Sequence, residues 1–191
     1  KNPMRASRSA EAPCLRRGLR RLWLVGAVLL APPVATADPV PHGDWVLVAA
    51  PGVCQLRHTR ISARSGAVLL EMLLLPPAPG ETGALAGLRV PLGVSLPNGI
   101  AWRHPAGPDQ AVALAWQHCD ADLCLAAGTI TEAELDRLRR GDRIEVGFRP
   151  LPTANPIRME VSLRGVTAGW RALEACAAAG GGKAPAPTSA S

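Results

Sequence analysis

Short apolar runs separated by turn residues recur along most of the chain. Past residue 43 these runs are either continuously apolar or alternate apolar with polar positions, over lengths typical of β-strands. Gly, Pro, Asn and Asp mark turns between them about every ten residues. The runs expected as strands are 44–48, 53–61, 67–75, 88–90, 99–103, 111–116, 123–130, 143–149 and 157–163.

Many short strands at this spacing predict a mostly β domain, either an antiparallel β-sandwich or a partly closed barrel, with one or two short helices. Run 67–75 is the most apolar and is interrupted only by Glu71, so we expect it to be central and buried on both faces. Segment 76–83 contains prolines that lack the backbone donor, which indicates a loop. Segment 38–43 is interpreted as a polar lead-in before the first strand.

One helix has clear boundary signals. Thr131 and Glu134 form a capping box, in which the threonine hydroxyl accepts from the Glu134 amide and the glutamate reaches back to the cap. Arginines at the end of this helix suit its dipole, and Gly141 is expected to form a left-handed cap. A second short helix is expected over 167–178.

The beginning of the chain follows another pattern. Arginines precede an apolar run over 22–31 that is too short to span a bilayer, and the small residues Ala35 and Ala37 follow. This order is typical of a secretory signal peptide cut between Ala37 and Asp38. The expected parts of the chain are a cleaved leader over 1–37, a β-rich domain over 38–179 and a disordered tail over 180–191.

The net charge of +6 belongs to the expected leader. Seven of the 21 Lys and Arg residues and one of the 15 acidic residues precede residue 38, so 14 of each remain. A formally neutral mature domain lacks the basic character of a nucleic-acid-binding protein. We also expect no transmembrane segment in the mature chain, because no later apolar run is long enough.

Of the five cysteines, four follow the leader, and an even number in an exported domain indicates disulfides. Cys119 and Cys124 flank a short polar stretch between two apolar runs, so a hairpin would bring them together. The second possible pair is Cys54 with Cys176, which would fasten the C-terminal segment to the second strand. His118 beside the first pair is a candidate metal group, but an oxidising compartment favours the disulfide.

Few residues of the sequence are candidates for a catalytic role. Ser95 lacks the second glycine of a nucleophile elbow, and the glycines of 180–182 resemble a phosphate loop only in composition. The four tryptophans past the leader are expected mainly in the core rather than on a stacking platform. They are Trp45, Trp102, Trp116 and Trp170. We therefore expect no enzymatic activity, no catalytic residues and no cofactor.

A central run of the sequence carries strong turn chemistry. Pro91 and Pro97 bracket an apolar stretch that includes Gly93, and Asn98-Gly99 is a hairpin-turn dipeptide. We interpret this run as a bent connection that places two strands in register.

Taken in order, several pieces of the chain resemble the invasion-associated locus B family of alphaproteobacterial envelope proteins. The most specific piece is the central run with Pro91, Gly93, Pro97, Asn98 and Gly99. The others are 43–45, 54–56, the Cys119 to Cys124 pair, the helix ending at Gly141, and 161–166. Together they extend over 43–173, which is nearly all of the expected mature chain.

The resemblance implies a signal-bearing, non-enzymatic, β-rich protein of the periplasm or outer envelope, in a family with members linked to virulence through host-cell invasion. Its partner would be an unknown protein or a component of the envelope or the host surface. A housekeeping periplasmic factor is one alternative, and a small metal-binding envelope protein is another. Many relatives carry a cysteine soon after the opening tryptophan, where this chain has Ala49-Ala50, so either Cys176 replaces that partner or Cys54 keeps its thiol.

Overall fold

The computed structural model of the protein describes residues 38–50, 52–105 and 107–180, so the expected leader and the tail beyond Gly180 lie outside the described residues. Most of the described chain is β-strand, with two α-helices and one 3₁₀ turn, η1. In chain order the elements are β1 Val40–His42, β2 Trp45–Ala50, β3 Val53–Ile61, β4 Val68–Leu75, β5 Ala84–Pro91, η1 Leu96–Asn98, β6 Ile100–His104, β7 Gly107–Cys119, β8 Leu123–Ile130, α1 Glu132–Arg140, β9 Arg143–Phe148, β10 Ile157–Ser162 and α2 Val166–Ala178.

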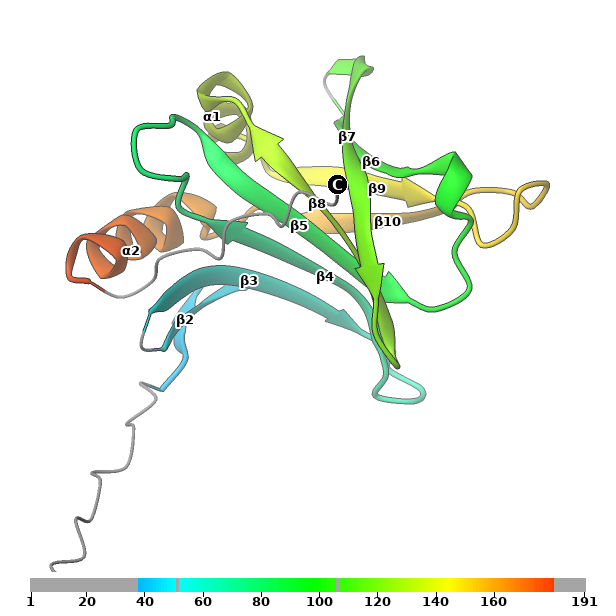
Figure 1. The fold of residues 1–191 in the computed structure, drawn as a ribbon, viewed down its shortest axis with the longest axis horizontal. Coiled ribbons are helices and arrows are strands. Elements are labelled where there is room, and N and C mark those ends of the chain that lie inside the picture. The colour runs from blue at the N-terminus through cyan, green and yellow to red at the C-terminus, as the bar shows by residue number, and fades with distance from the viewer. Residues whose placement is uncertain (1–37, 51, 106, 181–191) are drawn as a thin grey trace, which may run out of the picture. The chain divides into compact units, whose positions relative to one another are not determined.

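The strands form a single antiparallel sheet that curls into a half-barrel (Figure 1). Their order across the sheet is β1-β2-β3-β4-β5-β8-β7-β6-β9-β10. The predicted fold class, a mostly antiparallel β protein with short helices, is confirmed.

Strand β7 joins the two halves of the sheet. Its first part pairs with β6, where Val112 lies opposite Trp102, and its last part pairs with β8, where Cys119 lies opposite Cys124. A register shift between Trp116 and His118 separates the second pairing into two stretches. A strand that changes partner in this way lets the sheet bend without a new edge.

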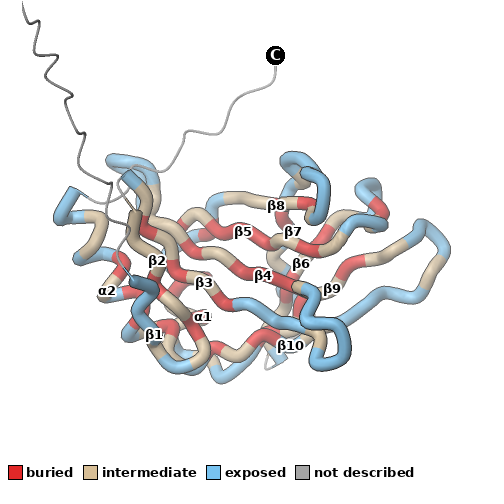
Figure 2. Tube along the Cα trace, turned by 90° about the horizontal axis from the view of Figure 1, so that it is seen from below, coloured by how far each residue is buried: buried red, intermediate tan, exposed pale blue. Residues whose placement is uncertain are grey.

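The core lies on the inner side of the curled sheet, where every second residue of the central strands is buried (Figure 2). Leu70, Met72 and Leu74 of β4 face this core and have no exposed surface. Helix α2 packs against β1, β2 and β3, and its buried Trp170 and Leu173 join the same cluster. Alternation of this kind is what a sheet with one buried face produces.

The segment before β2 and the segment after β10 form a clasp. The Asp44 amide donates to the Arg164 carbonyl at 3.0 Å, and the Trp45 indole donates to the Ser162 carbonyl at 2.8 Å. Asp44 also accepts from the Ser162 hydroxyl at 2.6 Å and the Arg164 guanidinium at 2.7 Å. Residues about 120 positions apart thus hold the beginning and the end of the sheet together.

Two glycines permit the close approach within this clasp. Gly43 and Gly165 both have positive φ, +62° and +101°. A Cβ on Gly165 would lie 1.9 Å from the His42 carbonyl oxygen, and one on Gly43 would lie 2.6 Å from the Arg164 carbonyl oxygen. Both backbones therefore require glycine, for conformation and for space.

The structure corrects several expectations about strands. Val40–His42, expected as part of a polar lead-in before the first strand, is the edge strand β1, where Pro41 is tolerated because one side of the strand has no partner. The second face of strand β4 is only partly covered, since Leu69 is 37% exposed whereas Glu71 on the same face is 5% exposed, so the expected burial of both faces is met in part. Strand β7 begins at Gly107, before the expected 111–116, because pairing with β6 overrides the weak strand preference of its first residues.

The boundaries of α1 are also partly corrected. Thr131 accepts a hydrogen bond from the Glu134 amide at 3.2 Å, as the capping box predicts. The Glu134 side chain does not reach back, because it accepts from the Trp102 indole at 2.7 Å instead. Gly141 is extended, with φ −82° and ψ 164°, so the expected left-handed cap is wrong.

The two ends of the sheet differ in what they carry. Helices α1 and α2 and the loop between β4 and β5 lie at one end, and the other end carries the β3–β4 turn, the β5–β6 connection, the β7–β8 turn and the β9–β10 loop (Figure 1). The strand registers place Ile61 opposite Val68, Pro91 opposite Leu123 and Ile157 opposite Phe148 at that second end. We call it the loop end, and it is formed by 62–67, 92–99, 120–122 and 149–156.

Candidate binding surface

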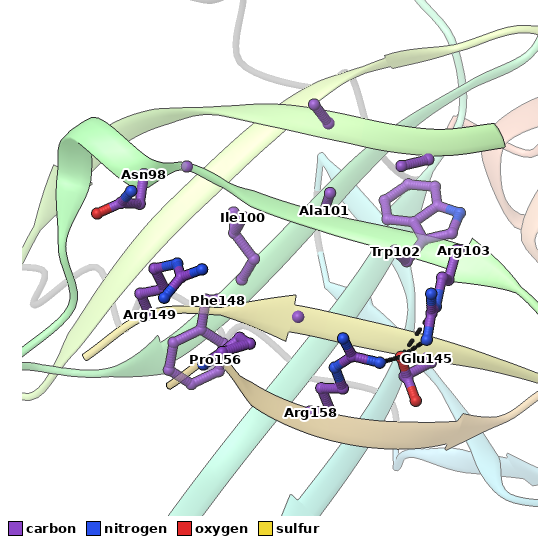
Figure 3. A pocket seen from close by; sticks show the side chains of 14 residues that line it. Asn98, Ile100, Ala101, Trp102, Arg103, Glu145, Phe148, Arg149, Pro156 and Arg158 are labelled. Carbon is purple, nitrogen blue, oxygen red and sulfur yellow. Dashed lines mark hydrogen bonds and ion pairs between the residues drawn. The ribbon is translucent and has the colours of Figure 1, made fainter. Parts of the chain in front are cut away.

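A shallow hollow of about 310 Å³ lies on the outer side of β6, β7, β9 and β10 (Figure 3). Its floor consists of small residues, because the register places Ala113, Ala101 and Gly147 side by side on adjacent strands. Arg158 of β10 lies opposite Gly147 and ends this row. A floor without large side chains allows a ligand to approach the sheet closely.

Arginines surround the floor. Arg103 lies opposite Glu145, and its guanidinium contacts that carboxylate at 2.7 Å, while Arg158 reaches the same Glu145 oxygen at 3.3 Å. Arg149 follows β9 at the far end of the hollow and donates to the Ala154 carbonyl (Figure 3). The lining thus contains three arginines and one carboxylate, an excess of two positive charges, and only Arg103 and Arg158 contact that carboxylate.

This arrangement suits an anionic ligand. Guanidinium groups bind carboxylates and phosphates through paired hydrogen bonds, and here both Arg103 and Arg158 contact a single oxygen of Glu145. The charge of Arg149 is balanced by a carbonyl dipole alone in the part of the chain that the structure describes. The hollow is therefore the candidate binding site of the described chain.

The central run with Pro91, Gly93 and Pro97 borders this hollow rather than forming a hairpin. It connects β5 to β6, which are separated in the sheet by β8 and β7. Asn98 and Gly99 end the 3₁₀ turn and do not form a two-residue hairpin loop. The run is a bent connection, as expected, but the two strands that it joins are not paired with each other, so it does not place them in register. Asn98 and Gly99 both line the hollow.

Ser95 anchors this connection. Its amide donates to the Arg149 carbonyl at 2.8 Å and its hydroxyl donates to the Asn98 side-chain oxygen at 2.7 Å. An amide oxygen is not a general base, so the arrangement gives the Ser95 hydroxyl a structural task. The connection is thereby fixed to the end of β9.

Both disulfides considered from the sequence are present in the structure. Cys54 of β3 is bonded to Cys176 of α2, with the two Cα atoms 6.2 Å apart. Cys119 and Cys124 are bonded across the β7–β8 hairpin, with Cα atoms 3.9 Å apart. The metal alternative at His118 therefore loses its thiolate ligands.

The hairpin tip is held by Asp120. Its carboxylate accepts from the amides of Asp122 and Leu123 at 2.9 and 2.8 Å. These hydrogen bonds hold the pKa of Asp120 below its usual range. No group of three or more His, Cys, Asp or Glu side chains suited to a metal ion occurs among residues 38–180, with 51 and 106 left aside.

Most of the tryptophans pack in the core, as predicted. Trp45, Trp102 and Trp170 are each at most 2% exposed, and Trp116 is partly buried. Trp45 also packs against the ring of His58, whose Nδ1 donates to the Asp44 carbonyl at 2.8 Å. Burial lowers the pKa of His58.

Sequence reasoning overlooked one buried charged cluster. Glu134 of α1 is 2% exposed and accepts from the Trp102 indole and from His104 at 2.9 Å. Arg137 pairs with the same carboxylate at 2.5 Å and also bonds Gln110. The cluster fastens α1 to β6 and β7. The apolar spacing of the helix did not predict it, because a buried glutamate is not part of an apolar helix face.

The fold and this surface define the class: a disulfide-tied, curled antiparallel β domain with an arginine-lined hollow on the outer face of its last strands. The chain belongs to the family of the invasion associated locus B (IalB) proteins, whose sequence profile matches residues 47–174. The helices of the described residues are all too short or too polar to cross a membrane.

Comparison with solved structures supports the fold. The chain is similar to the crystal structure of invasion associated protein B from Bartonella henselae, with a TM-score of 0.66 and 17% sequence identity, over 74% of this chain and 99% of that one. At this identity the likeness shows a shared fold. No curated protein matches the chain.

Proposed function

We propose that this IalB family member is an exported, non-enzymatic envelope protein that acts by binding a protein or surface component, with host-cell contact as one setting. The observation that carries the proposal is the pair of disulfides, Cys54 with Cys176 and Cys119 with Cys124. Disulfides of this kind persist in oxidising compartments, and the expected signal peptide over 1–37 provides a route to one.

The surface chemistry supports binding rather than catalysis. The hollow presents fixed arginines over a floor of small residues and contains Glu145 as its carboxylate. That carboxylate is already engaged by the guanidinium groups of Arg103 and Arg158, at 2.7 and 3.3 Å. An arginine-lined hollow is the chemistry of anion recognition.

The location is tested by protease accessibility in intact cells, compared with cells whose outer membrane has been opened. Fragments are read by mass spectrometry without reduction, so that the disulfides report folding at the same time. Cleavage in intact cells supports placement on the surface and contact with a host. Protection until the outer membrane is opened supports a periplasmic housekeeping role, and protection in both conditions that ends only on lysis contradicts export.

A further inference from the structure

Exposed aliphatic side chains gather at the loop end. Seven large hydrophobic side chains are exposed among the described residues, and Val40 is the one that lies away from the loop end, on a strand packed near α2. The other six are 37% to 63% exposed and are Ile61, Leu69, Leu92, Leu96, Leu151 and Ile157. A concentration of exposed aliphatic side chains at one end of a small domain is a candidate interaction surface.

The loops that carry these side chains are held next to one another. The Ser95 amide donates to the Arg149 carbonyl at 2.8 Å, which ties loop 92–99 to loop 149–156. Leu69, Leu92 and Ile157 line a mostly apolar groove of about 160 Å³ between them. Figure 2 shows the loops at this end as exposed segments beyond the buried strands.

The loops at this end hold two arginines and two acids, so their formal charges balance. Arg64 and Arg149 form no ion pair with an acid within the described ranges, and Arg158 lies where the arginine-lined hollow opens. The acids at this end are Asp120 and Asp122, and Asp120 is bound to Arg89 at 3.1 Å. Arginines thus lie beside the exposed aliphatic side chains.

We propose that the loop end docks the domain on the surface of an anionic phospholipid bilayer. The aliphatic side chains of loops 92–99 and 149–156 insert among the headgroups, and the neighbouring arginines contact lipid phosphates. The proposed function leaves the bound surface unspecified, and this proposal names that surface. It rests on the proposed function, because an exported protein meets membranes of this kind.

The geometry favours a bilayer over a protein partner. Leu96 and Leu151 project from separate loops and are 49% and 63% exposed, whereas a protein interface concentrates its contacts in one well-packed centre. A membrane interface receives separate side chains without a complementary shape. It also provides anionic groups at variable spacing, which matches arginines spread over three loops and strands.

The test uses a chain that begins at Asp38, with both disulfides formed. Residues 38–180 contain every strand of the sheet, both helices and all four bridged cysteines, so this chain has a complete core of its own. Its binding is measured by flotation with vesicles of phosphatidylglycerol and phosphatidylethanolamine, and with vesicles of phosphatidylcholine alone. We expect binding to the anionic vesicles and weaker binding as salt is raised.

Matched variants separate the loop end from the rest of the surface. Leu92→Gln with Leu151→Gln should weaken binding at least tenfold, because both side chains lose their insertion into the bilayer. Arg64→Gln and Arg149→Gln should each weaken it about fivefold. The controls at the other end, Val40→Gln and the exposed Arg171→Gln, should leave binding unchanged.

Three results would overturn the proposal. One is the absence of binding to anionic vesicles, and another is binding that the loop-end variants and the controls weaken equally. The third is evidence that the loop end is a protein interface. Such evidence would be binding only to isolated membranes that still hold their proteins, or self-association that the leucine variants abolish. None of these results bears on export, which the cell fractionation tests separately.

Discussion

At the scale of single residues, the pieces that resemble the family prove to be places where the backbone closes on itself. Gly43, Asp44 and Trp45 meet 161–166 in the clasp, and the two segments are joined by side chains as well as by amides. The residues could be recognised in the sequence, but their pairing could not, because contacts across about 120 positions depend on the strand order.

Replacing Gly165 by alanine tests the clasp. The new Cβ would lie 1.9 Å from the His42 carbonyl oxygen at a φ of +101°, so backbone would have to move. We expect a loss of about 3 to 5 kcal/mol in the free energy of unfolding, measured by urea denaturation. Gly93→Ala is the control, since its φ is +91° but nothing lies within 4 Å, and it should cost about 1 kcal/mol. Equal losses would contradict a steric role for Gly165.

Histidine 58 should make the stability of the domain depend on pH. Burial lowers the pKa of His58 in the folded chain below the usual 6.5 of the unfolded chain. At a pH between the folded and the unfolded pKa, the unfolded chain therefore binds a proton that the folded chain does not. Stability should therefore be full above pH 6.5 and decline as pH falls through the folded pKa. The measurement is the urea midpoint at a series of pH values, with His58→Gln reducing the decline and the exposed His118→Gln leaving it in place.

Asp44 should add a second decline at lower pH. The hydrogen bond from Arg164, followed by that from Ser162, lowers the pKa of Asp44 below 3.8. The stabilisation is present above 3.8 and is lost as pH falls through the lower folded value. Arg164→Gln should shift this acid transition to higher pH, whereas Arg171→Gln on α2 should not.

At the scale of elements, the apolar pattern predicted most strands and both helices, because each strand has one face on a single core. The exceptions depend on tertiary pairing. Strand β1 contains a proline and forms only as an edge partner of β2, and the first part of β7 is stabilised by β6. The arginine-lined hollow was not predicted, since Arg103, Arg149 and Arg158 meet only through the order β6-β9-β10.

Helix α2 should depend strongly on its disulfide. Cys54 and Cys176 close a segment of 122 residues, so Cys54→Ser with Cys176→Ser should cost about 2 to 5 kcal/mol of unfolding free energy. Cys119→Ser with Cys124→Ser opens a loop of only five and should cost less, about 2 kcal/mol in the chain-entropy account. Urea denaturation of both variants checks the order, and a larger loss from the hairpin pair would contradict it.

At the scale of the whole domain, the sheet, the clasp and the long-range disulfide make the beginning and the end of the described chain depend on each other. The Arg60 guanidinium also donates to the Glu160 carbonyl at 2.7 Å, which ties β3 to β10 across the open side of the half-barrel. Loop 76–83, in the middle of the described chain, lies apart from these long-range contacts. It connects β4 to β5 at the surface and is exposed over most of its length.

A single cut in this loop should therefore leave the domain joined. Glu81 is exposed there, whereas Glu132, Glu160 and Glu174 lie in hydrogen-bonded elements that resist cleavage. Brief treatment of the chain beginning at Asp38 with a glutamate-specific protease should yield 38–81 and 82–191, which stay linked through Cys54 and Cys176 in denaturant and separate on reduction. The Cys176→Ser variant should give separate fragments without reductant. Separation of the fragments of the unaltered chain in denaturant without reductant would show that β3 and α2 are not bridged, and the stability assigned to that disulfide would have to come from packing alone.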